Sequence, residues 1–207
     1  MQARQQAQQL ARARTLEAAC ALLAAPGGEL SLEAVAAAAG VTRVTVYNQF
    51  GSRPGLLLAV FAELGQRMRA ERIQAAMREP EPRRALELVV RESARAWQRQ
   101  RDAVKKVFAL AVLDPELGRE VKKAEKARRA GVVYLAQRLA AAGALGRGVS
   151  VAEASALLGA LTSFQAFEAL SAAGAGAALE RRQLALVQSA LELRAPGRRP
   201  VRKRRKP

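Results

Sequence analysis

The amino-acid sequence predicts an all-α protein. Ala, Leu, Arg, Glu and Gln, which all favour helices, dominate its 207 residues. No segment combines β-branched residues with alternation of polar and apolar side chains over more than a few positions, so nothing indicates a strand. Glycine and proline divide the chain into successive helices. We therefore expect a small three-helix N-terminal domain and a larger helical domain after it.

The N-terminal part is divided by glycine-containing breaks. A first helix is predicted to end at Pro26-Gly27-Gly28. Its apolar face is expected to carry Leu10, Ala13, Leu16, Cys20 and Leu23. Gly40 and Gly51 punctuate two short helices after it. A longer helix is predicted from about Ser52 to Met77, because two prolines follow it closely.

The remainder of the chain predicts longer helices. They are expected over residues 83–100, 104–113, 114–142, 149–173 and 179–194. Asp114-Pro115-Glu116 has the order of an N-cap, a first-turn proline and an acid that favours the helix dipole. Glycines and alanines around 174–176 form the turn between the last two helices.

Composition narrows the class of protein. The longest uncharged apolar stretches, such as residues 154–167, contain polar residues or glycine and fall short of the roughly 18 residues of a membrane span. The glutamine-rich start has no apolar signal-peptide region, and Cys20 is the only cysteine. We expect a cytoplasmic protein without disulfides or a membrane partner.

The sequence gives little support for an enzyme. It has no histidine, no glycine-rich phosphate loop and no carboxylate pair set apart from an ordinary helix surface. Cys20 lies on the apolar stripe of the first helix, where a small core residue is the simpler interpretation. No catalytic residue, metal ligand or cofactor is expected.

The formal net charge is +17, which suggests a polyanionic partner such as nucleic acid. A general bias of composition towards Ala, Arg and Gly would raise the charge without any function. Residues 1–53 hold only five basic and three acidic residues, whereas residues 196–207 hold seven basic and no acidic residues. This basic tail has no apolar face and is expected to be disordered and to attract phosphates non-specifically.

Residues 31–53 have the pattern of a helix-turn-helix. Ser31 is a good N-cap, and Leu30 before it can pack against Val35 one turn into the helix. Gly40 ends this helix after eight residues, and Thr42 caps the next one. Two capped helices joined by a tight glycine turn are typical of a helix-turn-helix.

The second of these helices separates its side chains by face. Val46 and Phe50 are four residues apart and can pack inward with Val35, Ala36 and Val41. The outer and flanking faces are left with Arg43, Val44, Thr45, Tyr47 and Asn48. Arg can bind guanine, Asn can bind adenine, and the Val and Thr methyls can contact the thymine methyl. This helix is therefore predicted to read the major groove of DNA.

These residues resemble the DNA-binding domain of the TetR repressors. The resemblance covers about residues 15–60 and rests on the following positions: Val35, Ala39-Gly40-Val41, Thr42, Tyr47 to Phe50, and Ser52-Arg53 with Leu56-Leu57. The sequence departs from the family pattern at Gln49, at Arg53, where lysine is usual, and at Pro54-Gly55, where acids are usual.

The resemblance implies a role for each site residue. Tyr47 and Arg53 would bind phosphates, and Thr42 would cap the recognition helix and reach the DNA backbone. Base edges would be read by Arg43, Val44, Thr45 and Asn48. Ser31 and Gln49 complete the predicted DNA-binding set, since Gln49 can still donate to a phosphate or a base.

The resemblance also implies a small-molecule site and a dimer interface in the larger domain. Candidates to line the small-molecule site are its bulky residues: Met68, Trp97, Phe108, Tyr134, Phe164 and Phe167. Bulky residues at helical spacing pack in a core more often than they contact a ligand, and an effector would be apolar or amphipathic. The last two helices would form the homodimer interface through Leu157, Leu161, Phe164, Leu184, Val187 and Leu191.

Two functional hypotheses follow. In the first, residues 1–53 bind a palindromic operator in double-stranded DNA, and residues 54–195 bind an effector and dimerise, so that the effector releases a transcriptional repressor. In the second, the same helix-turn-helix and the tail at 196–207 bind or organise DNA without an inducer. A discrete footprint favours the first hypothesis, and protection of all sequences favours the second.

Overall fold

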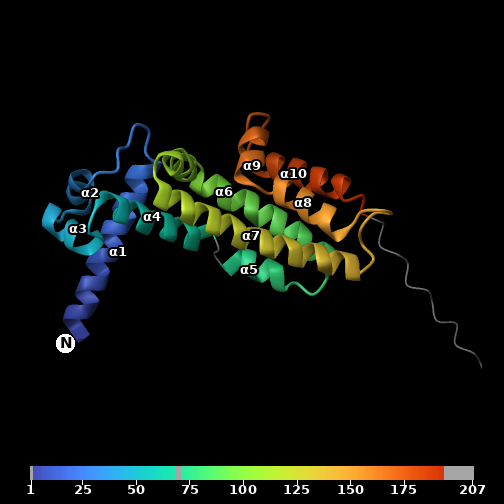
Figure 1. Ribbon diagram of the computed structural model, residues 1–207, viewed down its shortest axis with the longest axis horizontal. Helices are drawn as coiled ribbons and strands as arrows, with labels where there is room; N and C mark the ends of the chain where they lie inside the picture. The colour runs from blue at the N-terminus through green and yellow to red at the C-terminus, as the bar shows by residue number, and fades with distance from the viewer. Residues whose placement is uncertain (1, 69–70, 194–207) are drawn as a thin grey trace, which may run out of the picture. The chain divides into compact units, whose positions relative to one another are not determined.

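The computed structural model describes residues 2–68 and 71–193. This part of the chain contains helices and turns and no strand, which confirms the all-α prediction (Figure 1). Its helices are α1 (Gln2–Ala24), α2 (Leu32–Ala39), α3 (Arg43–Phe50), α4 (Arg53–Met68), α5 (Glu71–Arg78), α6 (Pro82–Leu113), α7 (Pro115–Ala141), α8 (Val151–Leu161), α9 (Phe164–Ser171) and α10 (Gly176–Ala190). None of these helices is both long and apolar enough for a membrane crossing. The predicted basic tail lies outside the described residues.

The chain divides into two compact units, and each unit has its own core. The first contains the described residues of 2–75 and 92–128, and the second contains 76–91 and 129–193. In the first unit, α2 and α3 pack against each other, and α1 packs against α2 and α4 (Figure 1). Leu23, Val35, Val46 and Val60 are buried in one apolar cluster there. This core fixes the position of α3, because α3 buries its inward face in the cluster.

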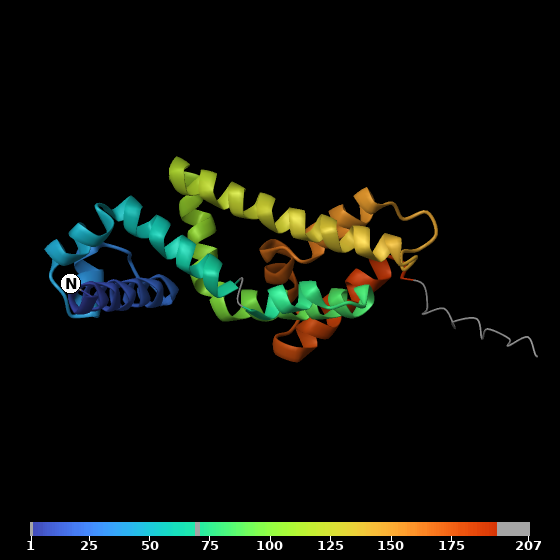
Figure 2. The same cartoon turned by 90° about the horizontal axis from the view of Figure 1, so that it is seen from below.

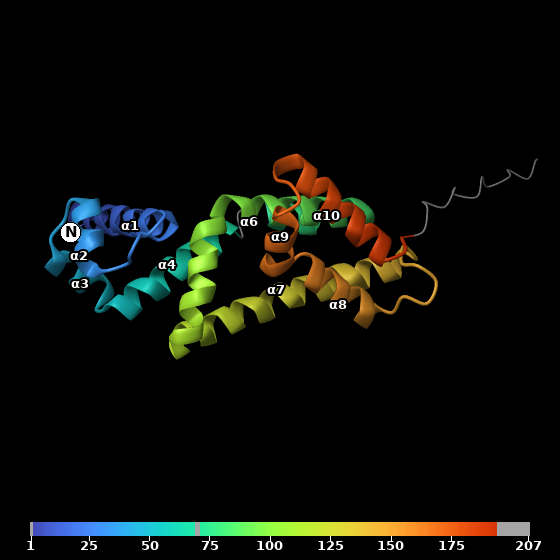
Figure 3. The same ribbon diagram turned by 90° about the horizontal axis from the view of Figure 1, so that it is seen from above.

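The second unit places the last three helices against one another. Helix α10 contacts both α8 and α9. Figure 3 shows that α10 runs in roughly the opposite direction to α8, with α9 between them in the chain. Figure 2 shows the same unit from the other side. The backbone N–H of Gly146, before α8, donates to the carbonyl of Leu191, at the end of α10, at 3.0 Å. The side chain of Gln183 donates to the carbonyl of Leu161 at the end of α8 at 2.6 Å. These bonds tie the loop before α8 to the end of α10, and the C-terminal end of α8 to the middle of α10.

Helix α6 is longer than predicted. The prediction of separate segments at 83–100 and 104–113 is wrong, since one helix runs from Pro82 to Leu113. No glycine or proline interrupts this stretch, so nothing in the local sequence forces a break. The N-cap predicted at Asp114 is confirmed, because its Oδ1 accepts from the N–H groups of Glu116 and Leu117 at 2.9 and 3.0 Å.

The single helix predicted over 149–173 is two helices in the structure. Between α8 and α9, the hydroxyl of Thr162 donates to the carbonyl of Leu158 at 2.6 Å. The hydroxyl of Ser163 accepts from the N–H of Ala166 at 3.1 Å and so caps α9. Side-chain hydrogen bonds of Thr and Ser compete with the backbone ladder, which explains the break.

The helix predicted over 52–77 includes residues 69–70, which lie outside the described residues, and one further prediction about the first unit needs correction. On either side of these two residues the structure describes α4 and α5, whose buried residues belong to different cores: Leu64 to the first unit and Ala76 to the second. On α1, Leu10 and Ala13 are exposed although they were predicted on the apolar face. The buried part of α1 starts at Thr15, because only its C-terminal half reaches the core.

Candidate nucleic-acid interface

The turn between α2 and α3 is fixed by local hydrogen bonds. The Ser31 hydroxyl accepts from the N–H of Ala34 at 3.1 Å, which confirms the predicted N-cap of α2. At the other end, Gly40 has a φ of 65°, and its N–H donates to the carbonyl of Ala37. The N–H of Val41 donates to the carbonyl of Ala36 at 3.0 Å. This pair of bonds ends the helix in a left-handed residue, where glycine carries no Cβ penalty.

Helix α3 is capped at both ends. The Thr42 hydroxyl oxygen accepts from the N–H of Thr45 at 3.1 Å and lies 2.9 Å from the Thr45 hydroxyl. At the C-terminal end, Gly51 has a φ of 74°, and its N–H donates to the carbonyl of Tyr47 at 2.7 Å. An eight-residue helix has little stability of its own, so the caps and the core packing hold it in place.

The two faces of α3 differ as predicted. Val46 is wholly buried, and Phe50 and Val41 pack against the same cluster as Val35 and Ala36. On the outer face, Val44 is 64% exposed and Tyr47 is 54% exposed. Large apolar side chains this exposed on a short, rigid helix are available for contact with a partner. Arg43 and Asn48 are exposed with them, whereas Thr45 and Gln49 are half-buried.

Arg43 forms an ion pair with Glu33 of α2, and both side chains are largely exposed. The pKa of the Glu33 carboxyl is held below its ordinary value, first by its own backbone N–H and then by the Arg43 guanidinium. An exposed ion pair contributes little to stability, because solvent screens it. Glu33 therefore holds the Arg43 guanidinium only weakly, and the sequence did not identify this pairing.

The start of α4 is held against the loop before α2 and the end of α3. The Nε of Arg53 donates to the carbonyl of Leu30 at 2.7 Å, in the loop before α2. The neighbouring Ser52 hydroxyl accepts from the N–H of Gly55 at 3.2 Å and caps α4. A Cβ at Gly55 would overlap the carbonyl oxygen of Phe50, the last residue of α3. The glycine at this position thus allows α4 to start close against the end of α3.

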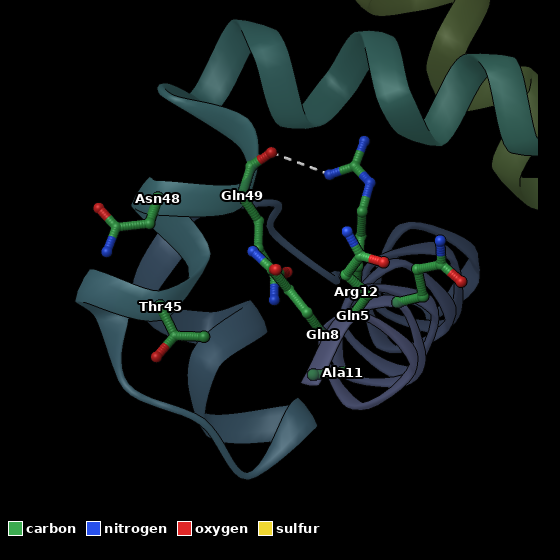
Figure 4. Close-up of a pocket in the computed structure, with 8 residues that line it drawn as sticks. Gln5, Gln8, Ala11, Arg12, Thr45, Asn48 and Gln49 are labelled. Carbon is green, nitrogen blue, oxygen red and sulfur yellow. Dashed lines mark hydrogen bonds between the residues drawn. The ribbon is translucent and has the colours of Figure 1, made fainter. Parts of the chain in front are cut away.

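Arg12 of α1 belongs to this site although the sequence did not reveal it. Its Nη1 donates to the backbone carbonyl of Gln49 at 2.8 Å, and its guanidinium lies 4.4 Å from the centre of the Phe50 ring (Figure 4). Both contacts are at the C-terminal end of α3, where a cation also complements the helix dipole. Residues 37 positions apart meet here only because the helices fold together, so no local pattern could have predicted the contact.

Part of the first unit matches a known protein family. Residues 16–60 match the model of the bacterial regulatory proteins of the tetR family. The matched range runs from the buried part of α1, through the capped helix-turn-helix, into α4. The N-terminal domain is a TetR-family DNA-binding domain. The resemblance seen at Val35, Ala39-Gly40-Val41 and Tyr47 to Phe50 is thereby confirmed.

The fold of solved TetR-family regulators extends over most of the chain. A TetR transcription regulator from Haloarcula marismortui is 14% identical, with a TM-score of 0.75 and coverage of 89% of this chain and 98% of that one. A TetR/AcrR-family regulator from Thermobifida fusca is 22% identical, with a TM-score of 0.67 and coverage of 87% and 96%. The ketosteroid transcriptional regulator of Mycobacterium tuberculosis is 18% identical, with a TM-score of 0.64 and coverage of 89% and 95%.

At these identities the likeness to solved structures is one of fold. A search of curated proteins gives no match to the chain. The TetR-family domain and the regulator fold make the protein a DNA-binding transcriptional regulator.

The predicted small-molecule residues of the regulator lie in both units. Met68, Trp97 and Phe108 belong to the first, and Tyr134, Phe164 and Phe167 to the second. Phe164 and Phe167 are buried, with ring centres 6.2 Å apart, whereas Tyr134 is 53% exposed beneath the guanidinium of Arg138. Phe164 and Phe167 therefore lie in the core of their unit, whereas Tyr134 lies at its surface.

The predicted dimer residues are mostly used within one subunit. Val187 and Leu191 are wholly buried, and Leu184 and Phe164 nearly so. A partner subunit could not contact Val187 or Leu191 without opening that core. Leu157 and Leu161 are partly buried and pack against the same cluster as Val187. Val187 and Leu191 therefore serve the core of their own unit, whereas Leu157 and Leu161 keep part of their surface exposed.

Proposed function

We propose that the regulator is a homodimeric repressor that binds a near-palindromic operator and is released by a small apolar or amphipathic molecule. The outer face of α3 carries the proposal: a capped, core-anchored helix exposes Val44, Tyr47 and Asn48, which suit base edges and phosphates. In this proposal residues 1–53 bind DNA and residues 54–195 bind the effector and dimerise. The protein acts by binding, without catalysis, in the cytoplasm where DNA is accessible to it.

The proposed roles within the DNA-binding domain follow the exposure of its side chains. Arg43, Val44, Thr45 and Asn48 face the bases, and Gln49 lies at the edge of this set. Tyr47 and Arg53 bind phosphates on the flanking backbone. The Nε of Arg53 is engaged by Leu30, so a phosphate would bind at its terminal nitrogens. Ser31 and Thr42, which cap α2 and α3, contribute through the backbone groups that they position.

The exposed faces of α8 and α10 support a dimer. Helix α8 exposes Ala152, Ala156 and Ala160 at a spacing of four residues, which places them on one face. Helix α10 exposes Ala185 and Leu186. Small side chains allow helices of two subunits to approach closely, with Leu186 as an apolar anchor. A two-fold dimer would place two α3 helices in successive major grooves about 34 Å apart.

A footprint on DNA selected from a random duplex library tests the operator proposal. We expect one protected segment with two inverted half-sites about one helical turn apart, occupied by an even number of chains in native mass spectrometry. Equal protection of all sequences would instead support the second hypothesis, a DNA-organising protein without an inducer.

Effectors are sought by thermal shift against apolar and amphipathic compounds. A stabilising compound that leaves operator affinity unchanged would contradict the release mechanism.

Alanine at the phosphate-binding positions is expected to weaken this complex. Tyr47→Ala and Arg53→Ala should each lower operator affinity by about tenfold, because each removes a contact to the backbone. Arg53→Ala should also reduce the logarithmic salt slope by about 0.9 for the lost charge, whereas Tyr47→Ala should not. Fluorescence anisotropy at several salt concentrations measures both quantities. Arg53→Lys is the control that keeps the charge, and an unchanged affinity in both alanine variants would refute the assigned roles.

A further inference from the structure

A groove of about 600 Å³ lies between α1 and α3, wholly within the first unit (Figure 4). The α1 side of the groove is lined by Gln5, Gln8 and Gln9, with Arg12 at one end. The α3 side is lined by Thr45, Asn48 and Gln49. One wall of the groove is therefore the recognition helix α3. The other wall is a face of α1 that has no part in the proposed function.

The α1 wall carries three uncharged amide side chains, with the Arg12 guanidinium at one end. Gln5, Gln8, Gln9 and Arg12 are spaced by three, one and three residues, which places them on the same face of the helix. All four side chains are exposed. No acidic residue occurs between positions 5 and 16, so nothing on this stretch repels an anion. A glutamine side chain can donate two hydrogen bonds through its amide nitrogen, and three of them converge on the groove.

The α3 wall contains an unsatisfied polar atom. The Oε1 of Gln49 is buried and has no hydrogen-bond partner among the described residues. Its side chain points from α3 towards Gln8 of α1 (Figure 4). Buried polar atoms are nearly always hydrogen-bonded in a complete structure. The unsatisfied oxygen therefore marks the seam between α1 and α3 as a place where a hydrogen-bond donor is missing.

Arg12 closes one end of the groove and holds its two walls together. Its bond to the Gln49 carbonyl and its contact with the Phe50 ring both fix α1 against the C-terminal end of α3. The guanidinium is thus engaged with protein groups. We assign Arg12 as a positioning residue, which sets the width of the groove.

We propose that the groove receives one strand of the operator duplex, with the amides of Gln5, Gln8 and Gln9 donating to its phosphate and sugar oxygens. This inference rests on the proposed function, because it requires α3 to lie in the major groove. The backbone that borders the major groove must then pass beside α3, and the α1 wall stands on that side of Thr45 and Asn48. Helix α1 thereby becomes a second DNA-contacting element next to the recognition helix.

The test compares glutamines on two faces of the same helix. The triple variant Gln5→Ala, Gln8→Ala, Gln9→Ala removes the amides of the groove, and Gln6→Ala removes an exposed amide that does not line it. Alanine favours helices, so α1 should remain folded, which the circular dichroism melting curve checks. We expect the triple variant to lose at least tenfold in affinity and Gln6→Ala to bind as the wild type does. The salt slope should not change, since the lost groups are neutral.

Ethylation interference locates the contact on the DNA. Ethylation of phosphates beside each half-site should impair binding of the wild type and of Gln6→Ala, and should no longer impair the triple variant at those positions. Two variants that each introduce a negative charge give a second readout. Gln8→Glu should weaken DNA binding far more than Gln6→Glu, because only Gln8→Glu places a carboxylate towards the strand. Equal affinities and equal interference patterns for the triple variant and Gln6→Ala would overturn the proposal.

The outcome separates this inference from the proposed function. If the wild type protects a discrete site and the triple variant does so equally well, only the groove proposal fails. If the wild type protects all sequences equally, the operator proposal fails, and the same variants are compared on a random-sequence duplex. A loss confined to the triple variant on that duplex supports the strand-binding groove. Arg12→Gln should widen the groove and reduce the interference at the same phosphates, whereas an unaltered pattern contradicts its positioning role.

Discussion

Val44→Asp is expected to abolish operator binding and to leave the protein folded. Val44 is 64% exposed on the outer face of α3, so a polar side chain there costs the folded state little. In the complex the same carboxylate would face the phosphates and acceptor-rich base edges of the major groove. Like charges brought together at an interface cost several kcal/mol, which corresponds to a loss of affinity of about a hundredfold or more.

Anisotropy titrations with the selected operator measure this loss, and thermal melting followed by circular dichroism measures the fold. The expected pair of results is an unchanged melting temperature and no specific complex. Val44→Ala is the matched control, since it removes the methyl contacts without adding charge and should bind with an intermediate affinity. Operator affinity within threefold of the wild type for Val44→Asp would mean that this face of α3 does not meet the DNA.

Val46→Asp, two residues further along the same helix, is expected to unfold the DNA-binding domain. Val46 is wholly buried in the apolar cluster that includes Val35, Leu56 and Val60. An ionised carboxylate in this cluster would have no partner, and an unpaired buried charge costs about 3–5 kcal/mol. Typical domains have a free energy of unfolding of about 5–15 kcal/mol, so most or all of the stability of this domain would be lost.

Hydrogen exchange read out by mass spectrometry resolves this effect by region. Protection should be lost over 15–64 in Val46→Asp, while the helices of the second unit keep theirs. Operator binding should be lost in both Val44→Asp and Val46→Asp, but only Val46→Asp should lose the fold of the DNA-binding domain. Protection of α2 and α3 in Val46→Asp equal to that in the wild type would contradict the burial of Val46 in the core of this unit.

Several parts of the site could be predicted because they depend on local sequence. The caps at Ser31, Thr42 and Asp114 each use a side chain within three residues of the N–H that it satisfies. Gly40 ends α2 because a left-handed residue is needed there. The inward position of Val46 and the outward positions of Val44 and Tyr47 follow from helical spacing alone.

Errors arose where the helix-forming pattern was ambiguous or where the partner lay far along the chain. Thr162 and Ser163 favour helices weakly, and only their hydrogen bonds in the structure divide the predicted helix into α8 and α9. Leu184, Val187 and Leu191 form an apolar row that suits either a subunit's own core or a dimer interface. Periodicity alone cannot distinguish these two uses of the row.

The sequence by itself determined the helix-turn-helix, because caps, glycine turns and helical periodicity act over a few residues. It also determined the all-α class, since strong helix formers extend along the whole chain. Only the tertiary structure decided which residues surround the recognition helix. Arg12 at Gln49 and Phe50, Arg53 at Leu30 and Arg43 at Glu33 meet through packing between helices, and their contacts carry no signature in local spacing. The groove beside α3 exists for the same reason: it requires α1 and α3 to be held side by side by a shared core.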